Sequence, residues 1–248
     1  MKINALATLL LFLTIACPVL GDGHGHGHGH GDGHGIEEAS KKLSNDNQYL
    51  SNINLIKGHL WVGIELYKNA QIENAKKHMK HPKAELYAAM IPTFKAKGAA
   101  GFASQLERLA LSVENEESYL AVMNNYQNLL KAINVNEQFV AKASTSVDQK
   151  ILLVISLLEI AAEEYAMGIV NGSVENKFEY QDALGFTTMA KNILEDAATE
   201  DKSQKQRLSN IASIVNKLSF LWPELAPNSN VNGDAKTILN AIAEIKDI

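Results

Sequence analysis

The sequence predicts an all-α protein, an antiparallel helical bundle of about eight helices, with two four-helix halves as one arrangement. Three observations favour this class. Apolar residues recur every three or four positions through most of the chain. After Gly35 the glycines become sparse and residues that favour helices take over. The pattern of a β-hairpin, an Asn-Gly or Asp-Gly turn between alternating apolar runs, is missing.

The first periodic segment covers residues 36–69 and is expected to be one helix or a broken pair of helices. A short helix over residues 72–80 should stop at Pro82, because the proline ring would clash with the carbonyl four residues back. Proline suits the first turn of a helix, so the next helix should begin at residue 83 and end near Gly98. The same reasoning places further helices over residues 100–112, 116–135, 137–143, 148–170, 178–198, 203–221 and 235–245.

Turn-forming residues mark the remaining boundaries. The pairs Asn171-Gly172 and Asn232-Gly233 lie beside helical patterns, so we interpret them as caps or turns. The segment Ala-Ser-Thr-Ser-Val at residues 143–147 is the best candidate for a hinge. A boundary near residues 144–148 would divide the bundle into two halves.

Residues 1–21 have the features of a secretory signal peptide. Lys2 precedes a largely apolar run, and small residues stand near the expected cleavage after Gly21. The run is too short for a membrane span, which needs about 20 residues. We therefore expect a periplasmic or secreted protein that is not an integral membrane protein. A lipid anchor at Cys17 is less favoured, because Thr14 stands where a lipoprotein signal has leucine.

Composition excludes several classes of partner and chemistry. Cys17 is the only cysteine, and cleavage after Gly21 would remove it. The exported chain would then have no disulfide, thiolate nucleophile or cysteine metal ligand. Acidic residues outnumber basic residues, 28 to 23, and no basic stripe is present. We therefore expect no nucleic-acid partner.

Residues 22–35 alternate glycine with side chains that bind metal ions. The glycines separate two aspartates and five histidines, namely His24, His26, His28, His30 and His34. Imidazole has a pKa of about 6.5, so it is largely a neutral ligand at neutral pH, and alternating glycine lets the backbone wrap an ion. We interpret this segment as a flexible tether that captures metal ions, ahead of a bundle domain over residues 36–248. A linker of biased composition or a cloning tag is the alternative.

Three further histidines, His59, His78 and His81, lie in the predicted bundle. On one continuous helix, His78, His81 and Glu85 would lie within about 60° of one another, which suits a shared metal ion. His59 would join them from the preceding antiparallel helix, and a kinked junction at Pro82 could preserve the group. The alternative is structural, with His81 as a cap, His78 solvated and His59 hydrogen-bonded in the core.

Acidic residues form a second group. Glu159, Glu163 and Glu164 lie on one predicted helix, and Glu179 and Asp182 share a face of the next. Carboxylates on facing helices can hold a cation between them. Acids in the first turn of a helix also stabilise its positive end, which accounts for Glu179 without a ligand.

We expect no enzymatic activity. The sequence lacks the His-Glu-x-x-His helix of zinc proteases, the Gly-x-Ser-x-Gly turn of hydrolases and a phosphate-binding glycine loop. An enzyme of haem or peptide chemistry is the least favoured alternative.

One segment resembles a known family. Glu164-Tyr165, the Asn171-Gly172 turn and Glu179-Tyr180 follow one another in the order found in the extracytoplasmic helical region of bacterial high-affinity iron permeases. The Arg-Glu-Gly-Leu-Glu membrane helices of those permeases are missing, so we expect that this chain does not itself conduct iron.

The general layout is also similar to that of imelysin-like exported proteins, which are helical bundles tied to iron uptake with histidine and glutamate at a metal site. Their His-x-x-Glu pattern is not matched, because Val62 and His81 stand three residues after His59 and His78. The resemblance therefore implies His59, His78, His81 and Glu85 as ligands only as a group, without individual roles.

The sequence therefore predicts a periplasmic metal-binding protein that assists iron or copper handling, with zinc as a further candidate ion. Its expected partners are the metal ion and an inner-membrane metal transporter or another envelope protein. The alternative is a non-catalytic cell-envelope interaction module in which the histidines are incidental.

Overall fold

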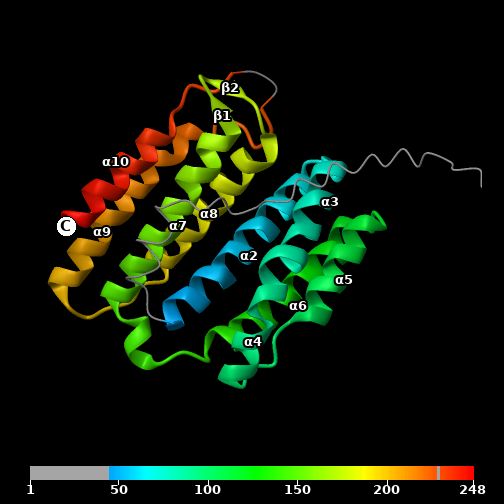
Figure 1. The fold of residues 1–248 in the computed structure, drawn as a ribbon, viewed down its shortest axis with the longest axis horizontal. Coiled ribbons are helices and arrows are strands. Elements are labelled where there is room, and N and C mark those ends of the chain that lie inside the picture. The colour runs from blue at the N-terminus through cyan, green and yellow to red at the C-terminus, as the bar shows by residue number, and fades with distance from the viewer. Residues whose placement is uncertain (1–44, 228–229) are drawn as a thin grey trace, which may run out of the picture. The chain divides into compact units, whose positions relative to one another are not determined.

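The computed structural model describes residues 45–227 and 230–248 (Figure 1). The predicted signal peptide, lipid-anchor cysteine and Gly/His-rich tether lie outside the described residues. The same holds for the predicted metal ligands His24, His26, His28, His30 and His34.

The described residues form nine α-helices with three short helical turns of other types, which confirms the all-α class. The elements are α2 (Asn45–Lys68), α3 (Ile72–His81), the π-helix η1 (Pro82–Tyr87), α4 (Ala88–Lys97), α5 (Ala103–Glu114), α6 (Tyr119–Glu137), the 3₁₀-helix η2 (Lys142–Thr145), α7 (Val147–Gly168), β1 (Ile169–Val170), β2 (Ser173–Val174), α8 (Lys177–Glu195), α9 (Lys202–Lys217), the 3₁₀-helix η3 (Leu218–Leu221) and α10 (Ala235–Lys246). Within this part of the chain, no helix combines the length and apolar character that a membrane span requires.

Side-chain caps fix where many of the helices begin. In each case an oxygen accepts a hydrogen bond from a backbone N–H of the first turn, a group that has no partner within the helix. The capping residues are Ser118 for α6, Ser146 for α7, Asn176 for α8, Asp201 for α9 and Asp234 for α10.

The prediction that Pro82 ends a helix is wrong. His81 and Pro82 both have helical dihedral angles, and the chain continues from α3 through the π-helical turn η1 into α4. A π-turn is wider than an α-turn, so the wider spacing accommodates a residue that lacks an N–H and whose ring crowds the preceding turn. The π-helical turn η1 therefore directly follows the helix that carries His78 and His81, and it continues that helix into α4.

Two other expected elements differ from the structure. Residues 138–141 are not helical, so the helix expected over residues 137–143 is reduced to the end of α6 and the short η2. Asn171 and Gly172 both have positive φ and connect β1 to β2 in a small antiparallel hairpin. This backbone suits Asn-Gly in a two-residue hairpin, and the strands escaped prediction because each has only two residues.

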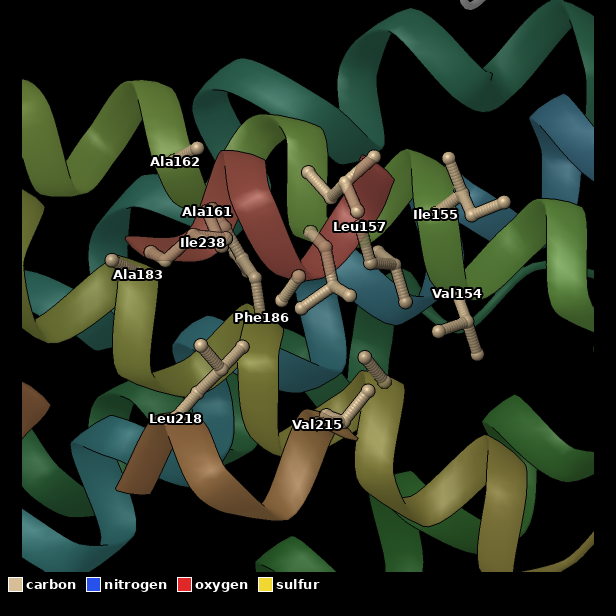
Figure 2. Close-up of a cluster of buried hydrophobic side chains, with 14 of the residues drawn as sticks. Val154, Ile155, Leu157, Ala161, Ala162, Ala183, Phe186, Val215, Leu218 and Ile238 are labelled. Carbon is tan, nitrogen blue, oxygen red and sulfur yellow. The ribbon is translucent and has the colours of Figure 1, made fainter. Parts of the chain in front are cut away.

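Buried apolar side chains form two clusters that meet at α2. The C-terminal cluster unites side chains of α7, α8, α9, η3 and α10 (Figure 2), with Leu55 of α2. The N-terminal cluster unites α2 with the helices from α3 to α6. Helix α2 contacts α3 and α8 (Figure 1) and buries 15 of its 24 residues. Most of the residues that this enclosed helix buries are apolar or glycine, and its buried polar residues are Asn47, Ser51, Asn54 and His59.

The division between core and surface predicts the effect of truncating leucines. Leu157 of α7 is fully buried in the C-terminal cluster, and Leu120 of α6 is 71% exposed. Leu157→Ala should lower the free energy of unfolding by about 2–5 kcal/mol, because it leaves a cavity. Leu120→Ala should change it by less than about 0.5 kcal/mol. Urea unfolding followed by circular dichroism measures both, and equal effects would contradict the assigned core.

Candidate metal centre

Three potential metal ligands from three helices converge inside the bundle. His59 belongs to α2, His78 to α3 and Asp182 to α8. Asp182 Oδ1 lies 2.6 Å from His59 Nδ1 and 3.1 Å from His78 Nδ1. One ligand atom from each residue lies within 4.8 Å of the others, and all three residues are buried. We call these residues the His-His-Asp triad.

Glycines let the helices approach closely enough to form the triad. At the crossing of α2 and α8, a Cβ on Gly185 would lie 2.7 Å from the backbone oxygen of Gly58. A Cβ on Gly58 would lie 2.7 Å from a ring carbon of Phe186. A Cβ on Gly63 would lie 2.6 Å from the terminal methyl of Met79 and 3.4 Å from Cβ of His78. A larger side chain at Gly185 would force α2 and α8 apart, because it would meet backbone atoms, whereas one at Gly63 would displace the flexible end of Met79.

Aromatic rings enclose the two imidazoles. The ring of Phe186 packs edge-on against His59, with the centroids 5.1 Å apart. Phe178 lies 5.8 Å from His78, and the ammonium of Lys77 covers the Phe178 ring at 4.2 Å from its centroid. These contacts exclude water from the triad and strengthen electrostatic interactions within it.

The triad is electrostatically coupled. Burial by itself lowers the pKa of His78, but the charge and hydrogen bonds of Asp182 outweigh it, and the net shift is upward. Burial by itself raises the pKa of Asp182, but the two histidines outweigh it, and the net shift is downward. A proton or another cation among these three groups is therefore stabilised.

A pair of glutamates lies next to the triad. Burial, followed by a hydrogen bond with Glu179, raises the pKa of Glu164 to about 10. The negative charges of Glu179 and Asp182 contribute to this shift. Glu179 is only 5% exposed, on the same helix as Asp182. At neutral pH Glu164 therefore keeps its proton.

The structure brings together two of the four ligands predicted in the bundle. His59 and His78 meet from antiparallel neighbouring helices, as the sequence suggested. His81 is partly exposed and is not one of the three residues that meet in the triad, so its role as a ligand stays a prediction. The side chain of Glu85 is outside the part of the chain that the structure describes.

Asp182 is the member of the triad that sequence reasoning placed in a different group of residues. Its spacing from Glu179 suggested a carboxylate pair facing α7, whereas its carboxylate meets two histidines more than 100 residues earlier in the chain. A signal was present, because Asp182 lies one turn into α8 and beyond the acids that stabilise a helix start. No local pattern could identify its partners.

The triad offers the donor set of two imidazoles and one carboxylate. Its three inward atoms, His59 Nδ1, His78 Nδ1 and Asp182 Oδ1, are buried and have no hydrogen-bond partner outside the triad among the described residues. Two histidines and a carboxylate with open positions bind Fe²⁺ in many proteins, and the same donors suit Zn²⁺ and Cu²⁺. The residues therefore fit a first-row transition-metal ion.

The close helix crossing gives a prediction about Gly185. Gly185→Ala should lower the free energy of unfolding by about 1–3 kcal/mol, because its methyl group would meet backbone atoms of α2 that cannot rotate away. It should also change the NMR signals of the His59 ring. Gly98→Ala is the control, since the position has positive φ but open space around it. That variant should be strained without altering His59. Unchanged His59 signals in Gly185→Ala would contradict the role of the crossing.

One comparison with known proteins found a match, and it covers the C-terminal part of the chain. Residues 140–248 match the family model of the iron permease-associated 4-helix bundle domain. This region contains α7, α8, α9 and α10, whose side chains build the C-terminal cluster. The comparisons with curated proteins and with solved structures found no match. The resemblance to imelysin-like proteins stays a prediction, whereas the resemblance to the iron-permease region is confirmed for residues 140–248, which connects this half of the chain with iron permease systems.

Proposed function

We propose that this protein binds a transition-metal ion, iron in the first place, at the His-His-Asp triad and serves as an exported accessory of an iron permease. The observation that carries the proposal is the convergence of three buried ligand atoms, from three helices, with no hydrogen-bond partner outside their own group in residues 45–227 and 230–248. Burying such groups is costly unless a cation or donor joins them. A metal ion would supply the missing partner.

The choice of iron rests on two independent supports. The donor set of two imidazoles and one carboxylate is typical of Fe²⁺ sites. The match of residues 140–248 to an iron permease-associated domain favours iron over zinc and copper, which the donors alone would accept. The export that residues 1–21 predict would place the protein where such a permease collects its substrate.

A second candidate function follows from the short contact between His59 and Asp182. At 2.6 Å, this contact is that of a charge-assisted hydrogen bond, and an imidazolium-carboxylate pair needs no metal. In that case the triad would hold α2, α3 and α8 together, and the protein would be a non-catalytic interaction module of the cell envelope. Metal titration separates the two candidates.

The proposal predicts that the triad binds about one equivalent of Fe²⁺ under anaerobic conditions. Asp182→Asn or His78→Ala should lower the affinity by more than about 100-fold, which exceeds the usual effect of losing an outer-shell partner. His81→Ala is the matched control, because His81 is three residues away on the same helix but outside the triad. Isothermal titration calorimetry, with circular dichroism to check helicity, provides the measurement.

The predicted tether over residues 22–35 requires its own control in that titration. Deleting residues 23–35 should remove weakly bound ions and leave the single equivalent at the triad. If His78→Ala and His81→Ala bound Fe²⁺ with equal affinity in the protein that lacks residues 23–35, the triad would be excluded as the metal site. That result would favour the interaction module.

Metal affinity should fall as the pH is lowered. The metal must displace a proton from His78, whose pKa is raised above the ordinary value of about 6.5 for histidine. A raised pKa means that the proton is retained to higher pH, so affinity should still increase as the pH rises above about 6.5, the ordinary pKa of histidine. Titrations at several pH values measure this dependence. A flat profile would show that no imidazole proton is displaced.

A further inference from the structure

Gln181 forms a fixed hydrogen-bond bridge behind His78. It lies next to Asp182 on α8 and is fully buried. Its Nε2 donates to the backbone carbonyl of Leu225 at 3.1 Å, and its Oε1 lies 2.9 Å from His78 Nε2. A backbone carbonyl can only accept, so the amide nitrogen must face Leu225. The amide oxygen must therefore face His78.

This orientation determines which nitrogen of His78 carries a proton. An amide oxygen can only accept, so His78 Nε2 must be the donor. In the neutral ring the lone pair then lies on Nδ1, the atom that faces Asp182 at 3.1 Å. Two acceptors would face each other there, and a cation between them satisfies both.

We infer that Gln181 is a positioning residue that holds His78 in the Nε2-protonated tautomer and thereby presents Nδ1 to the metal ion. The inference rests on the proposed function, and it deepens that function by naming the group that orients one ligand. Histidine ligands commonly donate their second N–H to such an outer-shell acceptor, which fixes the ring and the tautomer. Here the acceptor is the amide oxygen of Gln181, whose amide nitrogen is held by its hydrogen bond to Leu225.

The Leu225 carbonyl that holds the Gln181 amide belongs to the segment after η3, and this segment is itself bonded to α8. Trp222 Nε1 donates to the carbonyl of Tyr180 at 3.0 Å, and the Tyr180 hydroxyl donates to the carbonyl of Glu224 at 2.9 Å. These two bonds hold the backbone before Leu225 against α8. Rotating the Gln181 amide by half a turn would bring its oxygen against the Leu225 carbonyl oxygen and lose that hydrogen bond, so the orientation is strongly preferred.

Gln181 can make both of its hydrogen bonds, to His78 and to Leu225, with or without a metal ion at the triad. The amide oxygen of Gln181 accepts the hydrogen bond from the Nε2–H of His78 whether Nδ1 carries a lone pair, a proton or a metal ion. A proton and a metal ion therefore replace each other at Nδ1 without any rearrangement of Gln181. The ring need not rotate for binding, which reduces the entropy that binding would otherwise cost.

The test uses Gln181→Leu in the full chain, with Zn²⁺ as a diamagnetic probe. Loss of the amide should lower Zn²⁺ affinity at the triad about 10–100-fold, the usual range for an outer-shell partner. The neutral His78 ring, observed through its ¹⁵N signals, should shift toward the Nδ1-protonated tautomer, because Asp182 then offers the better acceptor. Gln181→Glu should restore the affinity, since a protonated carboxyl group can donate to Leu225 and accept from His78.

Thr187→Val is the matched control, because Thr187 is a buried polar residue of α8 whose hydroxyl has no hydrogen-bond partner among the described residues. It should leave affinity and tautomer unchanged. Equal Zn²⁺ affinity in Gln181→Leu and in the unaltered protein would overturn the inference. An Nδ1-protonated neutral His78 in the unaltered protein would overturn it even if Gln181→Leu failed to fold. Absence of Zn²⁺ and Fe²⁺ binding in the unaltered protein would instead overturn the proposed function.

Discussion

Asp182 imposes the constraint on which the rest of the site depends. The residue is only 3% exposed, inside a helical bundle, and a buried negative charge is tolerated only with positive or hydrogen-bonding partners. The nearest partners are two imidazoles, which can supply protons or accept a metal ion in their place. Because the same oxygen faces both rings, the three groups act as one unit, and removing any of them leaves the others uncompensated.

Helix α2 makes this unit possible because it belongs to both apolar clusters. It approaches α8 at Gly58 and α3 at Gly63, so one helix sets both distances within the triad. The triad therefore combines residues from two parts of the chain. Asp182 lies in the region that matches the iron permease-associated domain, whereas both histidines come from the part of the chain before it. The matched region contributes one candidate ligand, and the preceding helices supply the other two members of the candidate metal centre.

Periodicity and capping residues predicted the long helices within a few residues, because apolar spacing reports directly on the buried face of a helix. The same reasoning failed at Pro82, where a π-turn absorbs the proline, and at the hairpin beside Asn171, which has too few residues for a pattern. His59 and His78 were predicted to meet because they are close in sequence. Asp182 could not be paired with them, since the crossing at Gly58 and Gly185 joins helices far apart in the chain.

Glu164 limits the negative charge around the proposed metal ion. Burial, a hydrogen bond with Glu179 and the charges of neighbouring carboxylates raise the pKa of Glu164 to about 10, so this group keeps its proton at neutral pH. The retained proton spares the interior a further buried negative charge, which is costly without a cation beside it. A metal ion at the triad, as proposed, would therefore meet the charge of Asp182 without that of Glu164. Because a trivalent ion needs more negative partners than a divalent ion in a buried site, the proton on Glu164 favours a divalent ion in the proposed centre.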